Sequence, residues 1–217
     1  MIIALNGTVS CGKSYLAQAL SDAMPAEFRG EPPMSDWPNA TRLPQSHRDI
    51  KDLFLRSWRV SNLLEAQVLS KLKATVILDS VFDILHHTIV TQIEPGFFGS
   101  GPYASVLADC ARLDHERLPT PDVIVNVVVS WETWQDMCNA RGLDDFYPDA
   151  HLAKFFALQD VFHDAACLRG EELDIPVLCF ENRIAGSEDL SELAKTLTVP
   201  GLRKSGHRGT SRVNVQL

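Results

Sequence analysis

The sequence has few of the features that mark secreted, membrane-bound or zinc-binding proteins. Its five cysteines are scattered and form no CxxC pair, which argues against a disulfide framework and a zinc site and favours free thiols in a reducing cytosol. No apolar run approaches the length of about 18 residues that a membrane span needs. The N-terminus also lacks a basic region followed by a cleavage site. We therefore expect a cytoplasmic protein with neither a signal peptide nor a membrane span.

Internal repeats are absent as well, and 217 residues with 45% hydrophobic content favour one domain with a sizeable core. The net charge of −8 gives no general sign of affinity for nucleic acids or membranes. The charge is uneven, because residues 201–217 hold four of the 20 bases and none of the 28 acids. We expect a domain over residues 1–200 and a basic C-terminal tail over residues 201–217 that is mobile unless a partner orders it.

Short apolar runs alternate with helical patterns along the domain. The strands expected from these runs are Met1–Leu5, Glu27–Pro33, Thr75–Leu78, Val123–Val129 and Val177–Phe180. The helices expected are Lys13–Met24, Asp49–Leu72, Ser80–Gln92, Tyr103–Arg117, Trp131–Ala140, Ala150–Leu168 and Leu190–Leu197. Alternation of this kind predicts an α/β fold with three αβα layers, in which helices cover both faces of a parallel sheet of about five strands.

One motif between the first strand and the first helix has a clear chemical meaning. It consists of Gly7, Thr8, Val9, Ser10, Cys11, Gly12, Lys13 and Ser14, and it matches the phosphate-loop pattern GxxxxGK[ST] without a mismatch. The glycines allow backbone N–H groups to surround phosphates, and the helix N-terminus adds a favourable dipole. Lys13 is predicted to reach the β- and γ-phosphates of ATP, and the Ser14 hydroxyl to ligate Mg²⁺.

Two absences narrow the class of phosphate-loop protein. There is no NKxD-like guanine signature, and no apolar strand ends in the acidic pair that motor ATPases often have. These absences favour a kinase that moves the γ-phosphoryl group of ATP to an acceptor hydroxyl. Asp79, at the end of the strand Thr75–Leu78, is the best second acidic group for the Mg²⁺ site, with capping of the next helix as the alternative.

Beyond the phosphate loop, the chain resembles the deoxynucleoside kinase branch of the P-loop kinases, in order from the N-terminus to about Leu197. The segments that carry the resemblance are Glu31–Trp37 (similar to EPxxxW with one residue inserted), Leu55–Trp58, Leu78–Ser80, Arg141–Asp145 and Phe180–Asn182. The resemblance implies a P-loop kinase fold with a short lid. It implies that Glu31 is the general base, that Arg56, Trp58 and Asp79 lie on the substrate side, and that Arg141 belongs to the lid.

Three departures from that family concern specificity and charge. The arginine that follows the acidic residue at the third strand is absent, and Ser80 or Asp79 occupies its place. The second lid arginine is Leu143, and the residue that should be a base-reading glutamine is Arg56. These losses argue against ordinary deoxynucleoside specificity and reduce the positive charge near the transition state. Arg56 and Arg141 are the candidates to compensate.

Several candidate residues have two interpretations. Glu31 and Asp36 compete for the role of base, and both are alternatively solvated loop charges. Trp37 and Trp58 either stack on a planar base of the substrate or fill the core or its rim. Arg141 precedes an acidic loop, residues 142–148, where a mobile lid is expected. Its position favours a phosphate contact over a surface role.

Four functions remain open from the sequence. The leading one is transfer of phosphoryl from ATP to a hydroxyl of a nucleoside or nucleotide-like acceptor, with Mg²⁺ as the metal. The alternatives are a kinase for a hydroxymethylated base in DNA, an antibiotic-type small-alcohol phosphotransferase, and a nucleotide-binding protein without catalysis. Because the tail is basic, nucleic acid remains a candidate partner. A homodimer remains a candidate oligomeric state.

Overall fold

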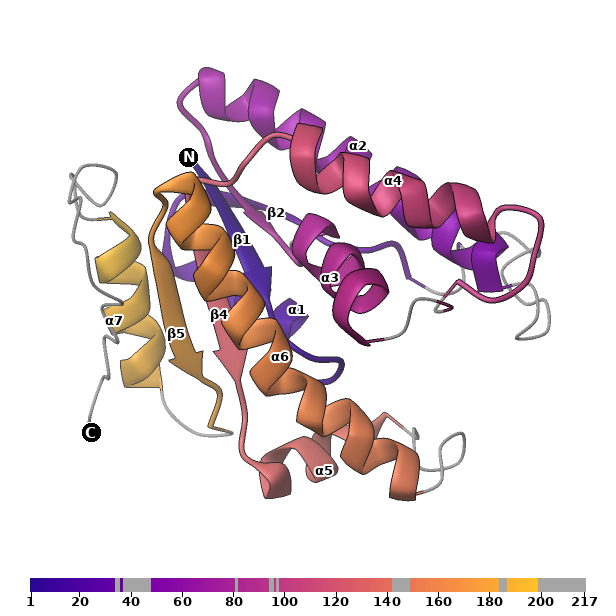
Figure 1. The fold of residues 1–217 in the computed structure, drawn as a ribbon. Coiled ribbons are helices and arrows are strands. Elements are labelled where there is room, and N and C mark those ends of the chain that lie inside the picture. Colours follow the sequence, from indigo (N-terminus) through magenta and orange to yellow (C-terminus); the bar gives the residue numbers. More distant parts are fainter. Residues whose placement is uncertain are drawn as a thin grey trace.

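The computed structural model describes residues 1–33, 36, 48–80, 82–93, 96, 98–141, 149–183 and 187–198. These residues form a five-stranded parallel sheet with helices on both faces (Figure 1), which confirms the expected three-layer α/β fold. The strands are β1 (Ile2–Asn6), β2 (Ala26–Arg29), β3 (Thr75–Leu78), β4 (Val123–Val128) and β5 (Val177–Glu181). Their order across the sheet is β2-β3-β1-β4-β5, so β1 is the central strand.

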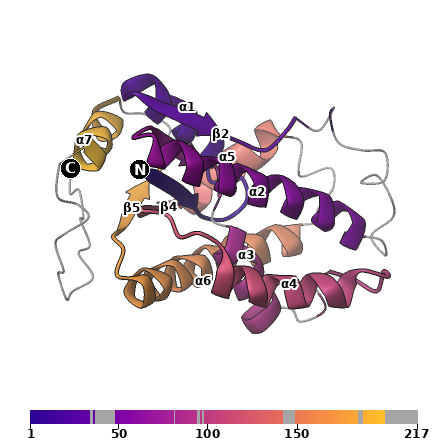
Figure 2. The ribbon, with the colours of Figure 1, turned by 90° about the horizontal axis from the view of Figure 1, so that it is seen from above.

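The helices form two layers on the sheet. They are α1 (Lys13–Ala23), α2 (Arg48–Lys71), α3 (Phe82–Thr88), the π-helix η4 (Ile89–Ile93), α4 (Ala104–Arg117), α5 (Trp131–Ala140), α6 (Asp149–Leu173) and α7 (Ser187–Thr198). Helices α1 and α7 pack together on one face, and α2 and α6 pack on the other (Figure 2). Helices α3 and α4 pack against this second pair. Within the described ranges, no helix combines the length and the apolar character that a membrane span requires.

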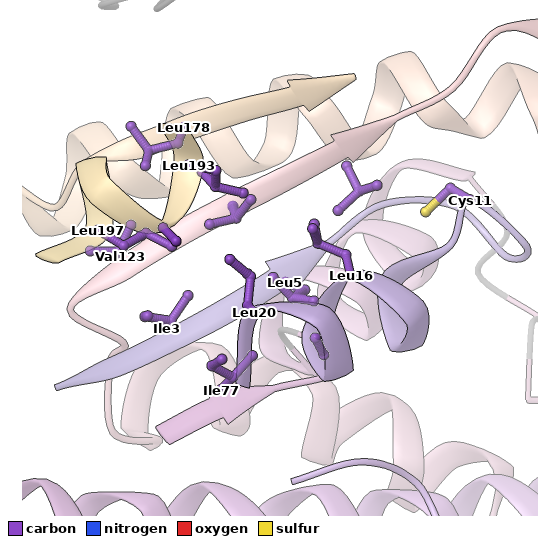
Figure 3. Packing of buried hydrophobic residues seen from close by; sticks show 14 of the residues in the cluster. Ile3, Leu5, Cys11, Leu16, Leu20, Ile77, Val123, Leu178, Leu193 and Leu197 are labelled. Carbon is purple, nitrogen blue, oxygen red and sulfur yellow. The ribbon is translucent and has the colours of Figure 1, made fainter. Parts of the chain in front are cut away.

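Side chains of β1 point alternately into two hydrophobic clusters. Ile3 and Leu5 pack with Leu16 and Leu20 of α1 in the larger cluster (Figure 3). Ile2 and Ala4 face the smaller cluster on the α2 and α6 side. Because both faces of the strand are buried, its sequence is a continuous apolar run and not an alternating one.

The predicted strand Glu27–Pro33 is too long. The structure ends β2 at Arg29 because it pairs residue for residue with only the four residues of β3. Pro32 and Pro33 also have no backbone N–H to donate to a sheet. Glu31 therefore lies in the segment that leaves the carboxyl end of β2.

Three helix boundaries differ from the predicted ones by two residues or more, and one of them is the start of α7, at Ser187 and not at Leu190. The helix expected over Ser80–Gln92 begins at Phe82 and continues as the π-helix η4. Helix α6 runs to Leu173, past the predicted end at Leu168. Gly170 lies within it, and an added Cβ there would come within 2.4 Å of Val177 Cγ2. This glycine allows α6 to approach β5 closely and is not a helix terminator.

Candidate active site

The phosphate loop follows the central strand and precedes α1, as its motif predicts. Gly7 has φ of 144°, Ser10 of 58° and Gly12 of 90°, all in the left-handed half of backbone space. A Cβ at Gly7 would lie 2.5 Å from the Val127 carbonyl oxygen. A Cβ at Gly12 would lie 2.2 Å from Nδ2 of Asn182. Both glycines are therefore required by backbone geometry and by close neighbours.

Three hydrogen bonds join the loop to residues outside the motif. Asn182, just after β5, donates from Nδ2 to the Cys11 carbonyl at 2.9 Å. The buried Trp134 of α5 donates from Nε1 to the Val9 carbonyl at 2.7 Å. The Thr8 hydroxyl donates to the carbonyl of Phe155 in α6 at 3.0 Å. Together these bonds fix the loop's shape, and the sequence motif contains no signal for the two external donors.

A buried polar network lies next to the loop. Asn6, the last residue of β1, donates from Nδ2 to Asn126 Oδ1 at 2.8 Å and to the Phe162 carbonyl at 2.9 Å. Nδ2 of Asn126 lies 2.8 Å from Nδ1 of His163. With this amide orientation Nδ1 of the imidazole accepts the hydrogen bond. The network satisfies amide groups that would otherwise be buried without partners.

The Lys13 side chain folds over the loop. Its ammonium donates to the Gly7 carbonyl at 2.9 Å and the Thr8 carbonyl at 2.7 Å. No ion pair to Lys13 occurs within the described ranges. Its charge therefore remains available to a bound polyphosphate anion, which is the role that the motif predicts.

Ser14 and Asp79 meet at the start of α1. The Ser14 hydroxyl donates to Asp79 Oδ2 at 2.8 Å, although the two residues are 65 positions apart in sequence. A hydroxyl and one carboxylate beside a phosphate loop fit Mg²⁺, which takes hard oxygen ligands and completes its shell with phosphate oxygens and water. The described residues contain no group of three or more His, Cys, Asp or Glu that would form an all-protein metal cage. The donor set suits a metal that arrives with nucleotide.

The predicted lid arginine reaches the phosphate loop. Arg141 ends α5, and its Nη1 donates to the Ser10 hydroxyl at 3.4 Å. Residues 142–148, which we predicted to form a lid, lie outside the described residues, as do Trp37 and the tail 201–217. Asp36 is exposed, and its backbone N–H bonds to the Pro33 carbonyl at 2.9 Å.

An open pocket lies close to the start of α1, and one of its lining residues, Asp79, contacts Ser14 of the phosphate loop. It is formed by the carboxyl ends of β2 and β3, by α2, by Ala4 of β1 and by the segment before β4. Its polar lining consists of Arg29, Glu31, Arg59, Asn62, Asp79 and Ser80. Glu31 and Asp79 thus share one pocket, and Asp79 connects it to Ser14 of the loop. Arg59 and Asn62 were missed by sequence reasoning, because nothing in a helical pattern shows which polar residues face a pocket.

Arg56 is not part of that pocket. Its Nε and Nη2 bind the two carboxylate oxygens of Asp114 at 2.7 and 2.6 Å, which joins α2 to α4. The Asp114 side chain is only 5% exposed. The hydrogen bonds to Asp114 raise the pKa of Arg56 above its ordinary value. The Arg56 guanidinium, which we predicted to contact the substrate, forms a bidentate ion pair with Asp114 in this structure.

We expect Arg56→Met to destabilise the chain by about 1–3 kcal/mol, because it leaves the buried Asp114 carboxylate without its charged partner. Urea unfolding of this variant measures the loss. The double variant Arg56→Met with Asp114→Leu should recover much of it, since no buried charge remains. Unchanged stability of Arg56→Met would show that the pair contributes nothing to the free energy of unfolding.

Trp58 lies near the pocket and is 39% exposed. Its indole Nε1 donates to the Gly30 carbonyl at 3.0 Å, immediately before Glu31. Trp58 therefore supports the segment that carries the candidate base, and it keeps part of its ring accessible.

No family model matches the chain, and no curated protein sequence does. Solved structures do. Deoxyadenosine kinase from M. mycoides with bound dATP superposes with a TM-score of 0.62 at 15% identity, over 91% of this chain and 98% of that one. The same enzyme with the products dCMP and dCDP gives a TM-score of 0.59 at 15% identity and the same coverage. Thymidylate kinase from Candida albicans gives 0.54 at 16% identity, over 90% of this chain and 88% of that one. The chain therefore has the fold of the P-loop nucleoside and nucleotide kinases, with a sequence that has diverged far from theirs.

Proposed function

We propose that this protein transfers the γ-phosphoryl group of ATP to a hydroxyl of a nucleoside or nucleotide-like acceptor. One observation carries the proposal. A single pocket contains both a candidate base, Glu31, and a carboxylate, Asp79, that contacts Ser14 of the phosphate loop at 2.8 Å. An acceptor in this pocket would lie beside the phosphates of a nucleotide on the loop.

The phosphate loop supplies the donor side of this proposal. Backbone N–H groups of residues 7–14 and the Lys13 ammonium bind the polyphosphate. Ser14 and Asp79 would hold the Mg²⁺ that accompanies ATP, which neutralises phosphate charge when bound. Arg141, already within hydrogen-bonding reach of Ser10, adds a further positive charge at the loop.

Glu31 supplies the acceptor side. Its carboxylate takes the proton of the acceptor hydroxyl as the oxygen of that hydroxyl forms a bond to the γ-phosphorus. The bond from the γ-phosphorus to the oxygen that bridges it to the β-phosphate breaks at the same time. The bridging oxygen leaves with ADP, and the phosphorylated acceptor is the second product. Asp36 is the alternative base, since it follows Glu31 closely in sequence.

The structural neighbours support the class of acceptor. One is a deoxyadenosine kinase and another is a thymidylate kinase, so the fold serves both a nucleoside and a nucleotide as acceptor. Since a shared fold constrains the acceptor only weakly, the choice must come from an assay. A hydroxymethylated base in DNA, a small alcohol and nucleotide binding without catalysis are the outcomes that would replace the proposal.

The test supplies labelled ATP and Mg²⁺ with nucleosides, nucleotides, small alcohols or hydroxymethylated duplex DNA, each at low and high salt. The chain is compared with a variant in which the four tail bases, Arg203, Lys204, Arg208 and Arg212, are replaced by glutamine. We expect transfer to a nucleoside or nucleotide that is insensitive to the tail change. Binding to DNA through phosphate contacts would instead weaken steeply with salt.

The outcomes separate the candidate functions. Transfer to DNA alone, lost with added salt and in the tail variant, would contradict the proposal and support the DNA kinase. Transfer to small alcohols alone would support the antibiotic-type enzyme. ATP binding without transfer to any acceptor would leave a nucleotide-binding protein.

We propose a homodimer as the oligomeric state. Light scattering on the same preparation measures it.

A further inference from the structure

We infer that Arg59 on α2 is the positioning residue for Glu31, and that it brings to the acceptor pocket the guanidinium that the chain lacks after β3. This inference rests on the proposed function. It adds a residue that lies outside every segment of the family resemblance.

The contact between the two side chains is direct. Arg59 Nε donates to Oε1 of Glu31 at 2.6 Å, and Nη2 donates to the same oxygen. The side chains are 16% and 29% exposed, so water screens the pair less than it would at the surface. Among the described residues, both hydrogen bonds that Glu31 accepts end on Oε1. This arrangement leaves Oε2 as the oxygen that receives a proton from an acceptor hydroxyl.

The same stretch of α2 also fixes the backbone before Glu31. Trp58 Nε1 and Asn62 Nδ2 both donate to the Gly30 carbonyl, at 3.0 and 3.1 Å. Positions 58, 59 and 62 lie within one turn of the helix and face the exit of β2. Helix α2 therefore holds both the backbone of this segment and one oxygen of the carboxylate.

Arg59 also places a positive charge in the pocket, where the arginine expected after Asp79 is absent. Ser80 follows Asp79 directly, at the place where the resembling kinases have an arginine. Ser80 and Arg59 line the same pocket. A guanidinium aimed into a partly enclosed site stabilises negative charge that develops during transfer, and its planar fork also orients a carboxylate. Here that group comes from α2.

A second arginine offers a matched control. Arg29 lines the same pocket, but its Nη2 pairs with Glu27 at 2.7 Å and with Glu65 at 3.5 Å. Neither of these carboxylates is a candidate base. If pocket charge alone mattered, replacing Arg29 or Arg59 would have similar effects. If positioning of Glu31 matters, Arg59→Ala loses more kcat than Arg29→Ala, and only the loss in Arg59→Ala is relieved by added guanidinium.

The experiment compares Arg59→Ala, Arg59→Lys and Arg29→Ala with the unaltered chain in the acceptor assay. Readouts are kcat, the KM values for ATP and acceptor, ATP affinity by calorimetry, and the unfolding midpoint. We expect Arg59→Ala to lower kcat by about 10²–10³-fold with ATP affinity unchanged. Guanidinium chloride, well below denaturing concentrations, should restore part of kcat in Arg59→Ala and none in Arg29→Ala. Arg59→Lys should be intermediate, because it keeps the charge without the fork.

Normal kcat in Arg59→Ala would overturn the inference. So would a loss that added guanidinium does not relieve, since a structural role predicts lower stability or ATP affinity without chemical rescue. The unaltered chain separates this failure from that of the proposed function. If it transfers phosphoryl to no acceptor, the proposed function fails and this role for Arg59 fails with it. If it is active and Arg59→Ala is not rescued, only the role of Arg59 is lost.

Discussion

Replacing Lys13 with alanine should lower phosphoryl transfer by about 10²–10³-fold or more while the chain remains folded. We propose that the ammonium faces the β- and γ-phosphates of bound ATP, and removing one group that stabilises transition-state charge costs rates of this size. The structural cost is small. Lys13 donates to the Gly7 and Thr8 carbonyls and lies 3.7 Å from the Cys11 sulfur, and each carbonyl bond contributes about 0.5–1.5 kcal/mol net.

Turnover, ATP affinity and the urea midpoint test this expectation. The matched control is Lys71→Ala, which removes an exposed ammonium at the end of α2, away from the loop. It should leave turnover unchanged. A Lys13→Ala protein with near-normal turnover would contradict the assignment of the phosphate loop to the reaction. A collapse of the urea midpoint would show instead that the two carbonyl contacts of Lys13 hold the loop together.

Glu31→Gln should lower turnover by about 10²–10⁴-fold with little change in ATP affinity. Glutamine keeps the shape of the side chain, and its amide oxygen still accepts from Arg59. What it loses is the ability to take a proton. Because the phosphate loop contacts are unaltered, donor binding should survive. Turnover of the variant with the preferred acceptor, set beside its ATP affinity, separates chemistry from binding.

Asp36→Asn is the matched control for this prediction. Asp36 is exposed and is the other carboxylate of the same segment. We expect its replacement to change turnover little. If only Asp36→Asn causes the loss, the base is Asp36, and the comparison of Glu31–Trp37 with the EPxxxW segment is misplaced by one position or more.

The fold was largely predictable because its three inner strands, β3, β1 and β4, are buried on both faces. Runs such as Ile2–Leu5 and Val123–Val129 are apolar at nearly every position, which is the pattern of parallel sheets covered by helices. Element ends were less predictable. The end of β2 depends on the length of its partner β3, and Gly170 depends on how closely α6 approaches Val177. Both features depend on residues far away in the sequence, so a local sequence pattern does not predict them.

In the candidate site, too, residues of a local motif were predictable and contacts between distant residues were not. The phosphate loop is one contiguous motif, so its residues could be named from sequence. The Ser14–Asp79 contact also followed, because the carboxyl ends of parallel strands meet at one edge. The partners of Glu31 and Arg56 could not be named. Arg59 lies 28 positions from Glu31, Asp114 lies 58 positions from Arg56, and charged residues on helices have many equivalent choices of partner.

The central place of β1 has a consequence for how the chain folds during synthesis. Its two sheet neighbours come from much later in the sequence: Ile2 is opposite Val76, and Ile3 is opposite Val123, 120 residues on. At about 5–20 residues per second, a ribosome needs about 6–24 s to make that stretch. Both edges of this apolar strand therefore lack a partner until β3 is made, and one edge lacks its partner until β4 is made. Its pairings are non-local, which makes folding slow, so chaperones that shield short apolar segments should matter most for this chain before β4 emerges.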